Sequence, residues 1–456
     1  MKHQPSHTIA RSCLVAGLAL VTALATACTG GGSNKAAAPA SVIATDASHA
    51  PTSITVWSFN TLAKEVKAFQ DDLGRLHQKY PWLTVKFVPG KDDAAFAKAV
   101  AAGDPPDVFI STAPDYVGQF CHNGTVLDMS QYLKLANIDV TKTFPAASLV
   151  YTQYQGKQCA LPLLTDAYGL YYNKKMFAAA GIASPPKTFS ELIDDAKKLT
   201  VKNADGSIKT FGLVTRTDYN LNANIFTGVH TNSKFYDAAG KATFASDPGW
   251  ANILQLDKSL QDFYGAGNVQ KFVGQYQPHS DDAANAFVKG AAAMEYDGEW
   301  HIGEIADEAP NLDYGIAPFP VPDDQLSRYG VGNTQGTVVY IPSRTKHAQE
   351  AYFAAQQLTT DTTFLTTLAD AVSNVPSTFD SLKAWDQAGN EHWKAMIDIL
   401  TNPGSYYKQL TAAGAQDATA WGTFTQNYER GKAGDLTAAL KKFDQQVNTM
   451  NAQAGQ

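Results

Sequence analysis

The segment from residue 53 to residue 110 alternates strand and helix patterns, and this order limits the possible folds more than any other feature of the chain. The patterns follow one another at 53–59, 62–79, 83–88, 92–102 and 107–110. Pro81 stops the first helix and Asp104-Pro105-Pro106 breaks the second, because proline lacks the backbone N–H that a helix interior needs. Strands that alternate with helices in this way predict an α/β sheet.

Size, charge and motif content narrow the class of protein further. The chain has 456 residues, more than one hydrophobic core usually serves, so we expect two lobes. Its 36 basic and 43 acidic residues give a net charge of −7, which argues against nucleic acid as a partner. The sequence contains no Gly-x-Ser-x-Gly turn and no His-Glu-x-x-His pair, so we expect no metal site and no cofactor.

The first 27 residues have the pattern of an export signal. Lys2 and Arg11 precede an apolar run at 14–27, which is shorter than the roughly 20 residues that a membrane-spanning helix needs. Small residues then lead into Cys28, and this arrangement resembles a bacterial lipoprotein start, which implies that the Cys28 thiol carries a lipid such as palmitate. Ordinary cleavage and secretion is the alternative, since Leu24 lies four residues before Cys28 and lipoprotein signals usually place it three before.

Export has two consequences for the rest of the chain. Residues 28–51 are polar and rich in Gly, Ala, Ser and Pro, so they cannot bury a core and are predicted to form a flexible tether. Cys121 and Cys159 remain as an even pair in an oxidising compartment, and we predict that they form a disulfide. Two buried free thiols are the alternative.

The most specific sequence is residues 160–177, in which Asp166 precedes a Tyr171-Tyr172-Asn173 run. Further motifs lie in order along the chain at 103–108, 287–294, 297–300, 313–320 and 341–347. Together the ordered motifs resemble the extracellular solute-binding proteins of ABC importers, in the large carbohydrate-binding family that includes maltose-binding protein.

The resemblance implies a two-lobed α/β fold of the periplasmic-binding-protein type (type II), with a ligand cleft between lobes that close as a hinge. The expected segments are 52–163 plus 331–376 for lobe 1 and 164–330 plus 377–456 for lobe 2. Crossings between the lobes are then expected near Thr165, Gly330 and Ser377. Helices are expected at 347–358, 361–371, 379–400 and 432–450.

A sugar ligand would need aromatic planes for its C–H face and carboxylates or amides for its hydroxyls. By resemblance, Trp300 is the stacking residue and Asp166 is a hydroxyl-binding carboxylate near the hinge. The alternatives are a tryptophan packed between helix and loop, and a helix or turn cap. Ligands collect beyond the carboxyl ends of strands in such sheets, which adds Trp57, Asn60, Ser111, Thr112, Asp115 and Tyr116 as candidates.

Other candidates come from the neighbourhood of these motifs. Tyr168 is expected in the cleft wall beside Asp166, and Glu299 belongs to the motif that ends at Trp300, whereas Tyr171 and Tyr172 are predicted core residues. The remaining candidates are Gly332, Asn333 and Thr334, where a turn would offer amide donors, and Trp421, which resembles a late stacking position of the family. A plain structural turn and a packing tryptophan are the respective alternatives.

The expected function is capture of a neutral sugar or oligosaccharide, without catalysis, by a monomeric lipoprotein at the extracytoplasmic face of the cell membrane. Its partners would be the transmembrane permease subunits of an ABC transporter and, through the lipid, the membrane. A glycerophosphodiester is the alternative ligand, although no basic cluster coincides with the motif loops. An exported carbohydrate hydrolase is the alternative class, with Asp297 and Glu299 as its two carboxylates.

Overall fold

The structure is a computed structural model that describes Pro39, Ser41 and residues 49–215, 219–220, 225–276 and 285–455. The predicted signal peptide, Cys28 and most of the predicted tether lie outside the described residues. Within the described ranges, no helix has both the length and the apolar character that crossing a membrane requires.

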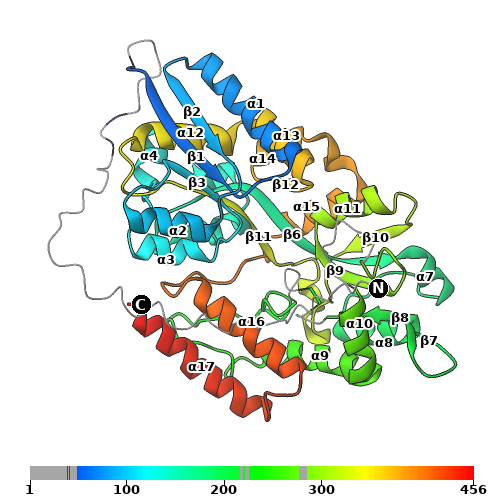
Figure 1. The fold of residues 1–456 in the computed structure, drawn as a ribbon. Helices are drawn as coiled ribbons and strands as arrows, with labels where there is room; N and C mark the ends of the chain where they lie inside the picture. Colours follow the sequence, from blue (N-terminus) through cyan, green and yellow to red (C-terminus); the bar gives the residue numbers. More distant parts are fainter. Residues whose placement is uncertain are drawn as a thin grey trace, which may run out of the picture. The chain divides into compact units, whose positions relative to one another are not determined.

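One mixed sheet organises the described part of the chain (Figure 1). Its strands are β1 (Thr52–Ser58), β2 (Leu83–Val88), β3 (Val108–Ser111), β6 (Leu161–Asn173), β7 (Val201–Lys202), β8 (Ile208–Leu213), β9 (Ala292–Gly298), β10 (Tyr314–Ala317), β11 (Thr334–Tyr340) and β12 (Val375–Pro376). The order across the sheet is β2-β1-β3-β11-β6-β9-β8-β7, and β10 and β12 also pair with β6. A separate ribbon joins β4 (Gln153–Tyr154) to β5 (Lys157–Gln158).

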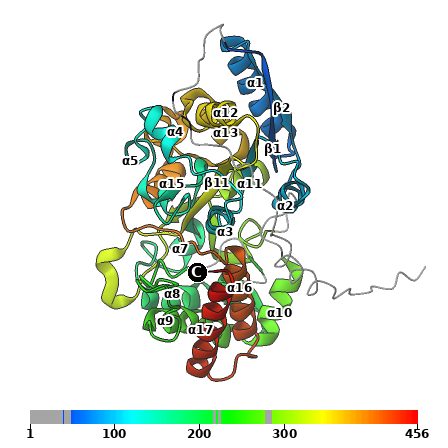
Figure 2. The same ribbon diagram turned by 90° about the vertical axis from the view of Figure 1, so that its left-hand side faces the viewer.

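Helices pack around this sheet along its whole length. They are α1 (Ala63–Lys79), α2 (Asp93–Ala102), α3 (Tyr116–His122), α4 (Ser130–Leu135), α5 (Val140–Thr143), α6 (Ala146–Val150), α7 (Lys174–Ala179), α8 (Phe189–Leu199), α9 (Pro248–Tyr264), α10 (Ala266–Gln275), α11 (Trp300–Glu308), α12 (Ala348–Thr360), α13 (Thr362–Val372), α14 (Phe379–Ala384), α15 (Glu391–Thr401), α16 (Ala415–Glu429) and α17 (Leu436–Gln453), with 3₁₀ turns η1 (Asp323–Arg328) and η2 (Asp386–Gly389). Figures 1 and 2 show α16 and α17, the last two helices of the chain, side by side.

The predicted order of strands and helices at the start of the sheet is confirmed. Strand β1 pairs in parallel with both β2 and β3, as a chain that returns through a helix requires. Successive side chains of β3 serve opposite faces: Val108 and Ile110 join the core beneath α1 and α13, whereas Phe109 joins a second cluster with α2 and α3. Both faces of β3 are therefore buried, which explains its almost wholly apolar sequence.

Strand β6 passes through two hydrophobic cores. Leu163 and Leu164 belong to the core that includes α1, α12 and α13, whereas Leu170 belongs to a core built from α8, α9, α16 and α17. Tyr171 is fully buried and Tyr172 is partly buried against the second core, so both are core residues of the strand, as predicted. Antiparallel pairing of β6 with β11 and β9 joins the two halves of the sheet.

The predicted single helix at 379–400 is wrong, because the chain forms α14 and α15 with a break between them. Trp385 has extended backbone angles (φ −75°, ψ 122°), and its indole N–H donates to Asp370 at 2.8 Å. Asn390 then starts α15, since its side chain accepts the backbone N–H of His392 at 2.9 Å. The apolar residues of the two short helices have the spacing of one continuous helix, so the sequence pattern does not reveal the break.

The predicted disulfide between Cys121 and Cys159 is present. It joins α3 to Cys159, two residues before the start of β6, across a sequence separation of 38. Both half-cystines are buried in the cluster that contains Phe109 and Tyr340. The bond therefore links the cluster around Phe109 to the start of β6, the strand that passes through both cores.

We expect removal of this bond by Cys121→Ala to lower the free energy of unfolding by about 2–4 kcal/mol, because the unfolded chain regains the freedom of the closed loop. Urea unfolding followed by circular dichroism measures the change. Cys159→Ala and the double variant are the controls, and all three should lose the same amount. Equal stability of the wild-type protein with and without a reductant would contradict this role.

Candidate ligand-binding site

Two pockets lie next to each other in the described structure, and each has a cavity of about 410 Å³. The first, here the Trp300 pocket, is lined by Phe59, Asn60, Glu65, Thr112, Leu163, Leu164, Asp166, Trp300, Glu304, Gln335, Thr337, Leu368, Val372 and Asn374. The second, here the Lys408 pocket, is lined by Asp115, Phe226, Thr227, Phe235, Asn333, Gln335, Tyr407, Lys408, Ala418, Thr419, Trp421, Gly422, Thr423 and Gln426. Gln335 lines both pockets, so the two cavities adjoin at its side chain.

The predicted site residues divide into three groups. Those in the lining of the Trp300 pocket are Asn60, Thr112, Asp166 and Trp300. Those in the lining of the Lys408 pocket are Asp115, Asn333 and Trp421. Those in neither lining are Trp57, Ser111, Tyr116, Tyr168, Glu299, Gly332 and Thr334. The loop after β1 therefore contributes Asn60 to a pocket, and the loop after β3 contributes Thr112 and Asp115.

Trp300 begins α11, and its ring is held from two directions. The Tyr168 ring meets the indole edge-on, with centroids 5.4 Å apart and planes at 87°. On another side the indole lies against Gly298, where an added Cβ would be 2.3 Å from the ring atom Cη2. The glycine of this motif is thus needed because the ring occupies the space of a side chain. The indole remains partly exposed where it lines the pocket.

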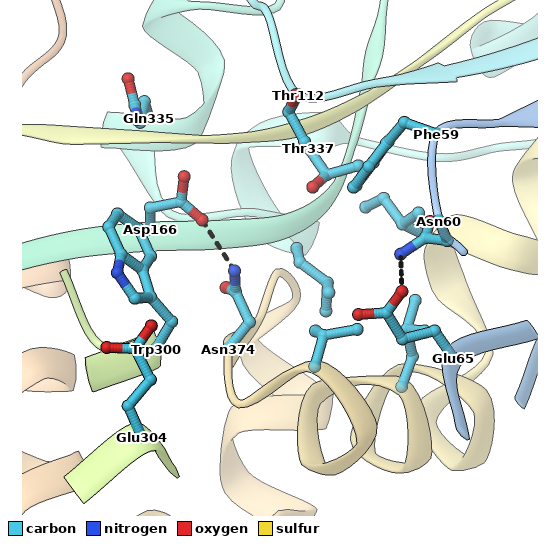
Figure 3. A pocket seen from close by; sticks show the side chains of 14 residues that line it. Phe59, Asn60, Glu65, Thr112, Asp166, Trp300, Glu304, Gln335, Thr337 and Asn374 are labelled. Atoms are coloured by element: carbon cyan, nitrogen blue, oxygen red, sulfur yellow. Dashed lines mark hydrogen bonds between the residues drawn. The ribbon is translucent and has the colours of Figure 1, made fainter. Parts of the chain in front are cut away.

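Asp166 lies in the middle of β6 and is partly exposed, whereas its neighbours from Leu161 to Tyr171 are buried. Its carboxylate accepts a hydrogen bond from the side-chain amide of Asn374 at 2.8 Å, as Figure 3 shows. Burial raises the pKa of Asp166 to about 6, although hydrogen bonds with Asn374 and Glu299 act in the opposite direction. The structure thus places a carboxylate at the pocket wall with its orientation fixed.

Glu299 lies behind Asp166 and is fully buried. Its Oε2 accepts the backbone N–H of Ala167 at 2.8 Å, and its carboxyl group also contacts that of Asp166. Burial and the charge of Asp166 raise the pKa of Glu299 well above its ordinary value. The interior position of Glu299 beside Asp166 therefore disfavours a second negative charge there.

The opposite wall of the pocket comes from the loop after β1. Asn60 is buried; it accepts a hydrogen bond from the Ser58 hydroxyl at 2.6 Å and donates to Glu65 at 3.2 Å, and Figure 3 shows the Asn60–Glu65 contact. Thr112, in the loop after β3, is exposed and lines the same pocket. The adjacency of β1 and β3 therefore brings both loops to one wall, as expected for strand ends in an α/β sheet.

The Lys408 pocket contains a buried ion-pair network. The Lys408 ammonium lies 3.0 Å from Asp115 and 2.9 Å from Asp417, and only 7% of its side chain is exposed. Asn333 is 4% exposed, and its side-chain oxygen has no hydrogen-bond partner within the described residues. Trp421 is buried, donates its indole N–H to the Phe226 carbonyl at 2.7 Å and stacks on Phe424, so it offers this pocket little more than an edge.

The predicted residues outside both linings have local contacts of their own. Ser111 is buried and donates to Asp93 at 2.7 Å, and the Tyr116 ring stacks on Phe120 at 5.3 Å. The Trp57 ring lies beneath the Lys91 ammonium at 5.0 Å. Among the buried candidates, Tyr168 contacts the Gln335 amide, Thr334 is fully buried in β11, and a Cβ on Gly332 would meet Ile399 at 2.3 Å.

Sequence reasoning missed several polar residues of the Trp300 pocket, among them Glu304, Gln335 and Asn374. A signal for two of them was available. Glu304 lies four residues after Trp300 and therefore on the same face of a helix, and Gln335 lies two residues after Asn333 and therefore on the same face of a strand. Asn374 gives no such signal, because the β12 segment reaches Asp166 only through tertiary pairing with β6.

We expect Glu299→Gln to change the pH dependence of stability. The raised pKa values of Asp166 and Glu299 mean that folding opposes ionisation, so wild-type stability is lost as pH rises through about 6 and above. A glutamine amide at position 299 does not ionise at any of these pH values, so the variant lacks the loss that comes from Glu299. In urea unfolding, the free energy of unfolding of the variant should therefore rise by at least about 1 kcal/mol relative to that of the wild type between pH 5 and pH 9.

The matched control for this experiment is Glu308→Gln, which removes a partly exposed carboxylate in neither pocket lining. Its stability should run parallel to that of the wild type across the same pH range. If the stability of Glu299→Gln also ran parallel to that of the wild type, the raised pKa of Glu299 would be disproved.

Comparison with known proteins identifies the family. A model of the bacterial extracellular solute-binding protein family matches residues 59–360. The maltotriose-binding protein of Pyrococcus abyssi is 25% identical over 263 residues, 58% of this chain, and the match spans only 50% of that protein's length. The multiple sugar-binding protein of Streptococcus mutans is 25% identical over 313 residues, 66% of this chain and 68% of the relative.

Solved structures give the same result for the fold. The structure of CpMnBP1 with mannotriose bound superposes with a TM-score of 0.72 at 26% identity, covering 86% of this chain and 99% of that one. The sheet that continues through two hydrophobic cores is thus the predicted two-lobed α/β fold. The family model covers more than half of the 456 residues, and the chain therefore belongs to the bacterial extracellular solute-binding proteins.

Proposed function

We propose that the protein captures a neutral sugar or oligosaccharide in the Trp300 pocket and delivers it to the permease of an ABC importer. The observation that carries this proposal is the composition of the pocket wall. A partly exposed indole lies there among carboxylate, amide and hydroxyl side chains, and the described lining contains no Lys, Arg or His. The relatives named above, which bind maltotriose, mannotriose or multiple sugars according to their names, support the same class of ligand.

The chemistry of a sugar matches this wall on two counts. The apolar C–H face of a pyranose ring packs on an aromatic plane, here the indole of Trp300. Hydroxyl groups donate to carboxylates and exchange hydrogen bonds with amides, here Asp166, Gln335 and Asn374. The Asp166 carboxylate is already fixed by Asn374 and Glu299, so little side-chain freedom is lost when a ligand binds.

The same wall argues against the phosphodiester alternative. Glu65, Asp166 and Glu304 all line the Trp300 pocket, and no cationic side chain of the described lining balances them. Phosphate is bound best by arginine or by helix N-termini, and it would be repelled by these carboxylates. A neutral ligand is therefore favoured.

A binding role is favoured over hydrolysis. The two carboxylates that suggested a hydrolase, Asp297 and Glu299, are both fully buried and line neither pocket. Glycoside hydrolysis requires a carboxylic acid and a second carboxylate that face the bond to be cleaved. The absence of new products after prolonged incubation with a bound sugar is the expected outcome.

We propose an oligosaccharide rather than a single sugar, with the two lobes closing over it. The Trp300 and Lys408 pockets meet at Gln335, so a ligand of several units would extend from one to the other. The lobe boundaries remain those predicted, with crossings near Thr165, Gly330 and Ser377. The two separate cores support two lobes. Leu382 and Leu400 lie in the segment assigned to lobe 2 but pack with the first core, so their contacts favour lobe 1.

The protein is proposed to act as a monomer at the extracytoplasmic face of the membrane, held there by a lipid on Cys28. Membership of the extracellular family supports the location. A polar tether from 28 to 51 would give the two lobes reach toward the permease.

We expect Trp300→Ala to weaken sugar binding by more than about 1 kcal/mol, because the variant loses the aromatic face on which the ring packs. Mannotriose and maltotriose are the first probes, and isothermal titration calorimetry on the purified, signal-less chain measures affinity. A wider panel of oligosaccharides with sugar phosphates follows by thermal shift, since a ligand of the folded state raises its melting temperature.

Phe379→Ala is the control, because it removes an exposed aromatic ring in neither pocket lining and should leave the affinity unchanged. Unchanged affinity in Trp300→Ala would remove Trp300 from the site. Stabilisation by sugar phosphates but by no neutral sugar would overturn the proposed ligand class.

We expect Cys28→Ala in the full-length chain to move the protein from the membrane fraction to the soluble fraction, because the variant lacks the thiol that would carry the lipid. Fractionation and immunoblotting measure the distribution, and the sugar affinity of the purified variant should equal that of the wild type. A variant that stays with the membrane fraction would disprove anchoring through Cys28.

A further inference from the structure

Glu304 is a carboxylate of the Trp300 pocket that none of the sequence motifs indicated. It lies one helical turn after Trp300 in α11, so both side chains project from the same face of that helix. In the view of Figure 3, the Asp166 and Glu304 side chains lie above and below Trp300. Asp166 comes from β6 and Glu304 from α11, so the indole has an acidic side chain on either side from two different elements.

A buried histidine holds the Glu304 carboxylate. His301 Nδ1 lies 2.7 Å from Glu304 Oε2, and the His301 side chain is only 1% exposed. On the other side of the ring, Nε2 lies 3.5 Å from Glu295 Oε2. The imidazole therefore connects the pocket wall to β9, which supplies Glu295 from the buried interior.

The groups around His301 favour its protonated form. Burial alone would lower the pKa of His301, but the hydrogen bond to Glu304 and the charges of Glu295 and Asp297 raise that pKa to about 9. The Tyr171 ring from β6 packs edge-on against the imidazole at 5.0 Å, and Phe287 packs at 6.2 Å. At neutral pH the Glu304 carboxylate thus has a cationic donor with a fixed position.

Glu295 and Asp297 have further donors of their own. Glu295 accepts from the Tyr219 hydroxyl at 3.0 Å and from the Asn285 amide at 3.2 Å. Asp297 accepts from the Asn220 amide at 3.1 Å and from the backbone N–H of Gly298 at 2.7 Å. These contacts hold the interior acids in place, so the imidazolium is fixed between them and the pocket.

We propose that Glu304 is a ligand-binding carboxylate of the Trp300 pocket and that His301 is the positioning residue that orients it. This inference rests on the proposed sugar-binding function. A carboxylate has several acceptor sites, so Glu304 accepts from His301 and still accepts sugar hydroxyls. Together with Asp166 it would bind hydroxyls on opposite edges of a ring that packs on Trp300, and thereby select the orientation of those hydroxyls.

The first test is Glu304→Gln, with Glu308→Gln as the matched control on the same helix. With the two trisaccharide probes and calorimetry at pH 7, we expect Kd to rise about tenfold in Glu304→Gln, since a neutral amide oxygen replaces the charged acceptor. Kd should stay unchanged in Glu308→Gln. Unchanged affinity in Glu304→Gln would overturn the assignment.

The second test separates positioning from a general structural role. His301→Gln should weaken binding in the wild-type background but add no further loss in a Glu304→Ala background, because it acts through the missing carboxylate. Independent, additive losses would overturn the positioning role. Melting temperatures of all four proteins show whether each variant is folded at the titration temperature.

The third test is the pH profile of binding. His301 carries its charge below about pH 9 and loses it as pH rises through that value, so wild-type affinity should fall above pH 9. In Glu304→Ala this fall should disappear. If affinity fell by the same factor in both proteins, the positioning role of His301 would be disproved.

A readout without any ligand distinguishes failure of this inference from failure of the proposed function. NMR titration of the chain labelled at histidine should show His301 charged at neutral pH, with a lower pKa in Glu304→Gln than in the wild type. If no sugar binds while this shift is seen, the function is wrong and the His301–Glu304 coupling stands. If sugars bind and the shift is absent, the coupling is wrong.

Discussion

The structure depends on one continuous strand that is buried in two hydrophobic cores. β6 extends from Leu161 to Asn173 and pairs with β11, β9, β10 and β12. A strand with apolar neighbours on both faces has no room for a charged side chain unless that side chain meets polar partners. Asp166 is the exception within this run, and its position is where the Trp300 pocket opens. The site thus lies where the central strand carries a partly exposed acidic side chain.

Burial of acids at the end of β9 forms a second constraint on the site. Glu295, Asp297 and Glu299 alternate along the chain and are all buried, so each needs a donor from another element. Glu299 meets a backbone N–H of β6, Glu295 faces the imidazole of His301, and Asp297 accepts from Asn220. Because β6 carries Asp166 and α11 carries His301, Trp300 and Glu304, the contacts of Glu299 and Glu295 hold the pocket wall from the interior side.

Local patterns allowed the early strands and helices, the disulfide and the core tyrosines to be predicted, because these features depend on spacing and composition alone. The break between α14 and α15 was missed, since Trp385 is bound by a residue of another helix. At the site, motifs predicted Trp300 and Asp166, and both line the Trp300 pocket. Tyr168 and Ser111 were predicted as well, but both are buried and line neither pocket. Which of two adjacent residues faces a cavity depends on register within β6 and on loop geometry, and neither is visible in one sequence.

Gly298 is required because ring atoms of Trp300, two residues later, occupy the space of its side chain. Its backbone does not adopt the left-handed conformation that usually explains a glycine, and its missing side chain is replaced by the Trp300 indole. Any larger residue at 298 displaces the ring, and any smaller ring at 300 leaves a void against the strand. The two positions therefore constrain each other, and a larger residue at 298 alone would move the ring that lines the Trp300 pocket and alter ligand choice without touching the ligand.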